Sequence, residues 1–138
     1  MANTQYAFLT KTNIPSLEQW QEVIDGDGFD FLLDPTLKPF EDSGFLPCKL
    51  GGKDSGFEIY YENSAEMLKF IDAIAPGNDY CIAFRWGGRM DECASTMIAS
   101  YALAKHFGAI VSYEGDTPYS DLDVFLKDTN NIIEDAWS

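Results

Sequence analysis

The chain has few of the residue types that nucleophilic, metal-dependent and redox sites require. Its 138 residues include one histidine, His106, and three cysteines, Cys48, Cys81 and Cys93. The cysteines show neither CxxC nor Cys/His spacing, which argues against zinc, and their apolar neighbours favour reduced, buried thiols. There is no G-x-S-x-G motif, and a Ser-His-Asp or Cys-His enzyme would have a single possible base. We therefore expect no metal, no cofactor and no catalytic set.

Basic residues and long apolar runs are also scarce. Nine Lys and Arg residues stand against 23 Asp and Glu residues, which gives a net charge of -14. Nucleic acids and anionic membrane surfaces carry the same sign of charge and are poor partners. No segment approaches the roughly 18 apolar residues of a membrane-spanning helix, and the N-terminal residues lack a signal-peptide pattern. We expect a cytoplasmic protein, monomeric or homodimeric, that binds neither nucleic acid nor membranes.

The remaining composition supports one folded core. Hydrophobic residues make up 46% of the chain and aromatic residues 14%, which is enough for a single domain over residues 1–138. Apolar periodicity, with capping, glycine and proline signals at the ends, predicts strands at 6–10, 29–33, 45–50, 57–62, 80–86 and 109–113, and helices at 16–26, 64–75, 91–107 and 120–135. Ser16 to Gln19 form a capping-box pattern, Met90 belongs to the apolar positions at helical spacing of the helix at 91–107, and Gly108 should close that helix. Residues 51–56 predict a longer hairpin loop, and Ile59 lies on the apolar face of the alternating strand at 57–62. The predicted fold class is α+β: a mainly antiparallel sheet of about five to six strands, layered with about four helices.

The stretch FRWGGRMDECAS, residues 84–95, has the outline of a ligand loop. A strand, a Gly-Gly turn and a helix start can place backbone N–H groups around a phosphate. However, Asp91 and Glu92 in the first helical turn would repel an anion, and the segment matches neither GxGxxG nor GxxxxGK[ST]. We interpret it as a sharp corner in which Asp91 caps the helix. An exposed Trp86 and Arg89 pair could still belong to a protein interface.

Acidic residues are concentrated in two regions, 18–42 and 114–138, each of which contains a single lysine. The run from Asp25 to Asp34 does not fit a calcium loop, because positions 6 and 12 are Asp30 and Thr36 where an EF-hand has Gly and Glu. Such patches speed encounter with a basic protein. The candidate binding residues are Asp25, Asp27, Asp30, Asp34, Glu41, Asp42, Glu114, Asp116, Tyr119, Asp121 and Asp123.

A small, strongly acidic α+β chain without a catalytic set resembles the immunity proteins encoded beside bacterial polymorphic toxins, including those of contact-dependent growth inhibition systems. The pattern FRWGG-x-x-DECAS-x-MIA-x-x-ALA over residues 84–104 adds to this resemblance. The resemblance implies a protein that binds the toxic domain of a cognate effector, often a nuclease with a basic surface. Binding would block the active site or the approach of substrate.

Two alternatives from other classes stay open at this point. One is a small enzyme with Arg85, Arg89 and His106 around the Gly87-Gly88 turn. The other is an acidic DNA mimic, with carboxylates spaced like phosphates along one face and an affinity that falls steeply as salt rises.

Overall fold

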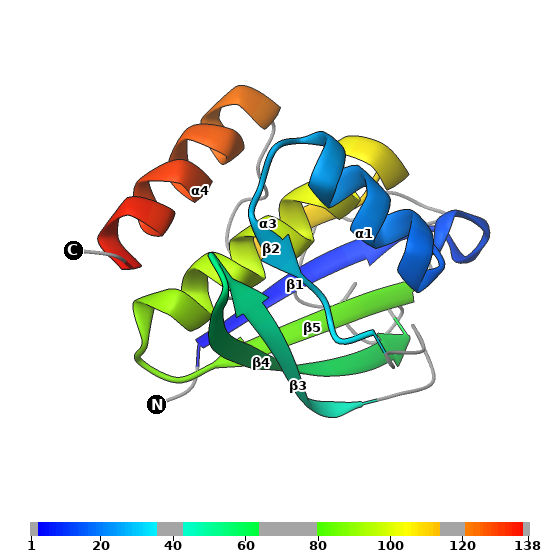
Figure 1. Ribbon diagram of the computed structural model, residues 1–138. Helices are drawn as coiled ribbons and strands as arrows, with labels where there is room; N and C mark the ends of the chain where they lie inside the picture. The colour runs from blue at the N-terminus through cyan, green and yellow to red at the C-terminus, as the bar shows by residue number, and fades with distance from the viewer. Residues whose placement is uncertain (1–2, 36–42, 64–79, 114–120, 137–138) are drawn as a thin grey trace.

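Six strands form one antiparallel sheet in the order β2-β3-β4-β5-β1-β6 (Figure 1). The computed structural model describes residues 3–35, 43–63, 80–113 and 121–136. The strands are β1 (Asn3–Leu9), β2 (Phe31–Leu32), β3 (Gly44–Leu50), β4 (Lys53–Asn63), β5 (Tyr80–Trp86) and β6 (Ile110–Tyr113). The predicted α+β class and its antiparallel sheet are confirmed.

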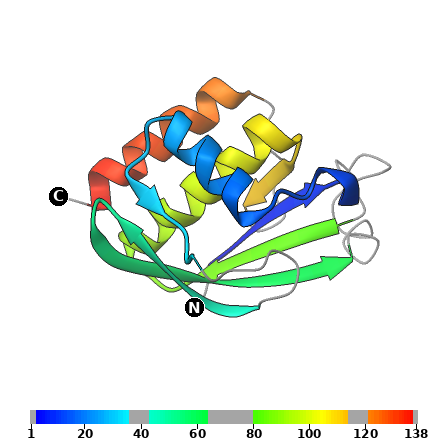
Figure 2. The ribbon, with the colours of Figure 1, turned by 45° about the vertical axis from the view of Figure 1, so that its right-hand side comes forward.

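The helices lie together on one face of this sheet (Figure 2). They are α1 (Leu17–Gly26), α3 (Met90–Phe107) and α4 (Leu122–Ala136), preceded by a 3-10 turn, η1 (Lys11–Asn13). The described residues thus hold three α-helices where about four were expected, and the helix expected at 64–75 lies outside them. Among the described residues, no helix has the length and apolar content needed to cross a membrane.

β5 lies inside the sheet, as its nearly continuous apolar sequence predicts. It pairs with β4 on one side and with β1 on the other. Side chains alternate between the two faces of a strand, so Ile82, Phe84 and Trp86 point toward the helices. Trp86 is only 6% exposed. The expectation that Trp86 and Arg89 form an exposed pair is therefore wrong, because the alternation of the strand continues and turns Trp86 toward the core.

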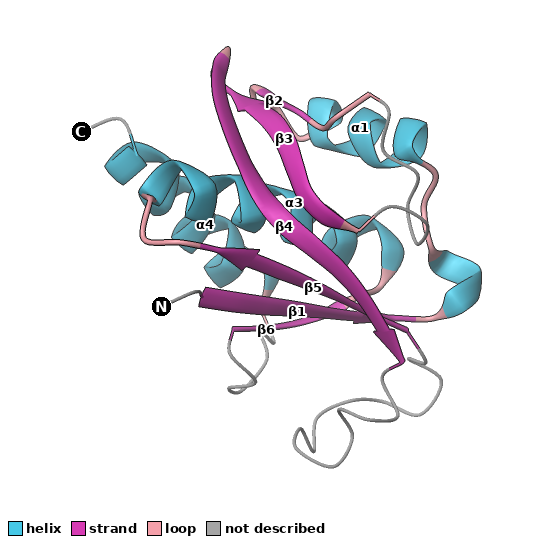
Figure 3. Ribbon diagram, turned by 90° about the horizontal axis from the view of Figure 1, so that it is seen from below, coloured by secondary structure: helices cyan, strands magenta, loops and turns pink. Residues whose placement is uncertain are grey.

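The β3–β4 hairpin has a tighter turn than its sequence suggested. A loop over residues 51–56 was expected, but pairing already begins at Leu50 opposite Lys53. Gly51 and Gly52 both have positive φ, 58° and 80°. Two successive positive φ values are what a two-residue type I′ turn needs, and this turn suits the twist of paired strands. The hairpin is accordingly long, and Figure 3 shows it curving away from the rest of the sheet.

Helix α3 is buried on all sides along its middle. Every residue from Ala94 to Leu103 is buried, whereas the sequence pattern indicated one apolar face. The helix lies between the sheet and α4 and also contacts α1, so each side has a neighbour (Figures 1 and 2). Met90, expected to face inward, is 41% exposed because it precedes this buried stretch.

The helix ends follow capping rules, with one correction. Ser16 and Gln19 form the predicted capping box at the start of α1. Asp91 does not cap α3, because the cap position is Arg89, which makes no side-chain capping bond. Asp91 instead lies in the first turn, where its carboxylate complements the helix dipole and accepts two hydrogen bonds of 3.0 Å from Arg89. Gly108 closes α3 with a φ of 71°, as predicted.

Trp20 fixes α1 to the rest of the core. Its side chain is fully buried, and its indole N–H donates to the carbonyl of Ala99 on α3 at 3.1 Å. Its ring packs edge-on against Phe84 of β5, with ring centroids 6.4 Å apart. One residue of α1 thus contacts both the central helix and the sheet, which sets the position of α1 beside β2.

Replacing Trp20 should loosen α1 in two measurable steps. Trp20→Phe keeps most of the ring and loses the N–H donor, which should lower the free energy of unfolding by about 1–2 kcal/mol. Trp20→Ala also leaves a large cavity and should lower it by about 3–5 kcal/mol. Urea unfolding followed by circular dichroism measures both. Equal losses in the two variants would contradict the role given to the ring.

Candidate functional site

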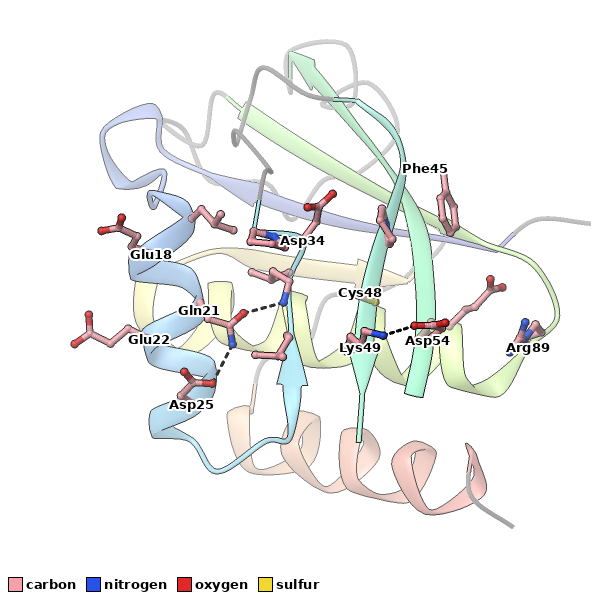
Figure 4. Close-up of a pocket in the computed structure, with 17 residues that line it drawn as sticks. Glu18, Gln21, Glu22, Asp25, Asp34, Phe45, Cys48, Lys49, Asp54 and Arg89 are labelled. Atoms are coloured by element: carbon pink, nitrogen blue, oxygen red, sulfur yellow. Dashed lines mark hydrogen bonds and ion pairs between the residues drawn. The ribbon is translucent and has the colours of Figure 1, made fainter. Parts of the chain in front are cut away.

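An open groove of about 1230 Å³ extends over the outer sides of α1, β2 and β3 and reaches the start of α3 (Figure 4). One wall comes from α1, with Leu17, Gln21 and Asp25 among its residues. Segments distant in the sequence meet here, because β2 pairs with the end of β3 and α1 lies along the other edge of β2. The groove is therefore a product of the tertiary fold.

Apolar side chains line much of this groove and are open to solvent. Leu32 is 53% exposed and Phe45 is 65% exposed, and the exposed Pro47 lies near Phe45 on β3. Phe45, Pro47 and Lys49 alternate with the buried Leu46, Cys48 and Leu50, so they share the outward face of the strand. Large exposed apolar groups gathered in one concave surface are typical of binding sites.

The charged residues of the groove are mostly acidic. Among the described residues, two basic side chains line it, and both already form ion pairs: Lys49 with Asp54, and Arg89 with Asp91. The hydrogen bond from Lys49, followed by its charge, lowers the pKa of Asp54. Six carboxylates of the described residues line the groove: Glu18, Glu22, Asp25, Asp34, Asp54 and Glu92. The described lining thus has an excess of four negative charges at neutral pH and suits a cationic ligand.

Gln21 ties the α1 wall to β2 through its side-chain amide. Its Nε2 donates to the carbonyl of Phe31 at 2.8 Å and to Asp25 Oδ1 at 2.9 Å. Its Oε1 accepts from the backbone N–H of Leu33 at 2.8 Å. The amide therefore binds β2 as a peptide group of a neighbouring strand would. Dashed lines in Figure 4 mark its hydrogen bonds to Asp25 and to the backbone of Leu33.

The sequence-predicted binding residues do not form one site. Asp25 and Asp34 line the groove, whereas Asp30 is exposed outside its lining. At the start of α4, Asp121 Oδ1 accepts from the backbone N–H of Asp123 at 2.8 Å, which caps that helix. The predicted residues Glu41, Asp42, Glu114, Asp116 and Tyr119 lie outside the described residues. Glu18, Glu22 and Glu92 were not predicted as site residues, although the first two belong to the acidic region at 18–42.

Asp27 stabilises the fold, whereas the sequence predicted that it binds a partner. Its carboxylate is 7% exposed and accepts from Lys105 Nζ at 2.8 Å and from His106 Nε2 at 3.0 Å. Burial by itself would raise the pKa of Asp27, but the hydrogen bonds and charges of Lys105 and His106 together lower it. The hydrogen bond to Asp27 in turn raises the pKa of Lys105. This cluster joins the C-terminal ends of α1 and α3.

The two thiols nearest the surface cavities are poor nucleophiles. Cys48 lines the groove, and burial raises its pKa to about 11 despite hydrogen bonds involving Ser95 and Ser55. Burial likewise raises the pKa of Cys93 to about 11. A thiol attacks as its thiolate, so both groups are largely unreactive near neutral pH. Within the described parts of the chain, the three cysteines are free thiols and no three Cys, His, Asp or Glu side chains converge as metal ligands.

The Gly87-Gly88 corner borders a smaller cavity of about 480 Å³, which Arg89 also lines. Arg89 and His106 lie at opposite ends of α3, an 18-residue helix and hence about 27 Å long. Arg85 is exposed on β5 opposite Glu58, whose carboxylate accepts a 2.9 Å hydrogen bond from Tyr60. The structure therefore does not bring Arg89 and His106 together around one small substrate.

Comparison of the chain with protein-family models, with curated proteins and with solved structures finds no match.

Asp27→Asn should lower the free energy of unfolding at pH 7 by about 1–2 kcal/mol, because the pairing with Lys105 loses its charge. The lowered pKa of Asp27 means that this contribution is complete above its unfolded pKa of about 4 and disappears as pH falls through the folded value. The raised pKa of Lys105 means that the stabilisation from this pairing persists until pH exceeds about 10. Unfolding curves of both proteins from pH 2.5 to 9 test this. A difference as large at pH 2.5 as at pH 7 would contradict the assignment.

Gln21→Leu should destabilise the groove wall, since the carbonyl of Phe31 and the N–H of Leu33 lose their shared partner. We expect a loss of about 1–3 kcal/mol in the free energy of unfolding. Gln21→Glu is the matched variant: it can still accept from Leu33, but it places a carboxylate oxygen against the Phe31 carbonyl and the Asp25 carboxylate, so its loss should be larger than that of Gln21→Leu. Thermal and urea unfolding rank the variants, and the reverse order would refute the amide's bridging role.

Proposed function

We propose that this chain is a non-enzymatic acidic binding protein that neutralises a cognate basic toxin domain by direct contact, as an immunity protein does. One observation carries the proposal: exposed Leu32 and Phe45 lie in the same groove as an excess of carboxylates. Apolar groups supply affinity and the surrounding charge selects a cationic partner. The role places the protein in the cytosol of the cell that it protects.

The groove's charges support a cationic partner over a neutral one. Lys49 and Arg89 are already paired with carboxylates, so neither of these two cations is available to Glu18 or Glu22 on the α1 wall. Toxin domains that act on nucleic acid must present cations to phosphates. A protein with net charge -14 attracts such a surface over a range of about a Debye length, near 10 Å at 0.1 M salt.

Charge by itself does not make a tight complex. Exposed ion pairs contribute only about 0–1 kcal/mol each, whereas buried aromatic and apolar anchors dominate most interfaces. Phe45 and Leu32 provide such anchors at the groove. The raised pKa values of Cys48 and Cys93, and the separation of Arg89 from His106, support binding as the activity in preference to covalent catalysis.

Coexpression with the toxin domain encoded beside its gene tests the proposal. The two chains should co-purify, cells should survive the toxin, and the dissociation constant should rise about tenfold between 0.05 and 0.3 M salt. No complex and no protection with any neighbouring basic toxin domain would refute the function.

A pair of charge-matched variants then locates the contact. Glu18→Gln with Glu22→Gln should slow association several-fold, since both groups line the groove. Asp123→Asn with Glu134→Gln removes the same charge from α4 and should slow it much less. Stopped-flow association rates at low salt measure both, and a larger effect of the α4 pair would move the contact to the C-terminal acidic region.

A further inference from the structure

The outer edge of β2 is already occupied. Gly51 donates to the carbonyl of Asp30 at 2.8 Å, so residue 30 directs its backbone groups toward β3. Directions alternate along a strand, hence Leu32 also points toward β3, whereas Phe31 and Leu33 point to the outer edge. Gln21 binds the Phe31 carbonyl and the Leu33 N–H there, which leaves a partner strand little to pair with on β2.

The adjoining edge of β3 carries a proline. β2 pairs only with Leu50 and Lys49 of β3. By the same alternation, Lys49, Pro47 and Phe45 direct their backbone groups toward the β2 side. Pro47 has no N–H to offer there, and proline in edge strands is a known means of discouraging strand addition. Both accessible stretches of this edge are thus poorly suited to an added strand.

The ring of Phe45 lies across β4. A Cβ built on Gly56 would lie 2.4 Å from Phe45 Cζ, so the ring occupies the space above this glycine. The ring is nevertheless 65% exposed, which leaves its other side open to the groove. An aromatic ring held in place before binding loses little conformational freedom in a complex.

We propose that this groove recognises an apolar or aromatic side chain flanked by lysine or arginine on a partner protein, and that it does so through side chains and not by strand addition. The apolar group would contact Phe45 and Leu32, and the flanking cations would meet Glu18, Glu22 and Asp25. Charge complementarity selects this occupant, because Lys49 and Arg89, the two cations among the described residues of the groove, are already paired. This inference rests on the proposed function and specifies which part of the toxin is bound.

Short peptides test the inference directly. The probe is an N-acetylated pentapeptide amide with a central tryptophan between two arginine-lysine pairs, compared with its serine analogue and with a version N-methylated at the three central residues. Calorimetry should give measurable binding for the first, about tenfold weaker binding for the serine analogue, and binding within about twofold for the methylated one. Methylation removes main-chain donors, so strand addition would be lost while side-chain docking persists.

Protein variants assign the site. Phe45→Ser should weaken the tryptophan peptide about tenfold, while Val124→Ser, at an exposed apolar position on α4, should leave it unchanged. Glu22→Lys should weaken it several-fold more than Glu134→Lys, which alters net charge equally. Phe45→Tyr keeps the ring and should retain binding. If Phe45→Ser does not fold, the Glu22→Lys variant and the serine peptide still test whether the groove is the binding site.

Three outcomes would overturn the inference. Loss of binding on N-methylation would indicate strand addition. Equal effects of Glu22→Lys and Glu134→Lys would indicate attraction by net charge only. If the chain neutralises a basic toxin and the Phe45→Ser and Glu22→Lys variants bind that toxin with full affinity, the proposed function holds but the groove is not the binding site. If the chain binds no basic toxin domain, the proposed function itself is wrong.

Discussion

The burial of α3 on every side determines where its neighbours in the fold must lie. Ten consecutive residues are inaccessible, so the sheet, α1 and α4 must each cover a different side of this helix. Trp20 meets this requirement for α1 by contacting Ala99 and Phe84 together. Since α1 is held at a fixed place beside β2, its outward carboxylates face the groove, and the acidic wall is a consequence of how the core is packed.

The same packing divides the acidic residues into internal and external groups. Asp27 faces the end of α3, where the carbonyl end of the helix dipole favours Lys105 and His106, and it becomes part of the fold. Asp25 lies two residues earlier and faces the groove. A helix turns about 100° per residue, so neighbouring carboxylates on one helix can take opposite roles. Net charge by itself therefore does not identify a binding surface in this protein.

Local patterns predicted most of the described elements. The capping box at Ser16, the alternation around Ile59 and the apolar run of β5 depend on near neighbours, and the α+β class followed from their order. The groove could not be predicted, because Gln21, Leu32 and Phe45 meet only after β2 pairs with β3 and Trp20 places α1. The paired glycines at the hairpin did contain a usable signal for a tight turn, but the longer loop was expected.

Hydrogen exchange of the chain, alone and with the proposed basic toxin domain bound, would show where the partner makes contact. Binding should slow exchange within Leu17–Gly26 and Gly44–Leu50 and change it little within Leu122–Ala136. Protection confined to α4 or to the Gly87-Gly88 corner, with the groove segments unchanged, would contradict the claim that the acidic groove contacts the partner.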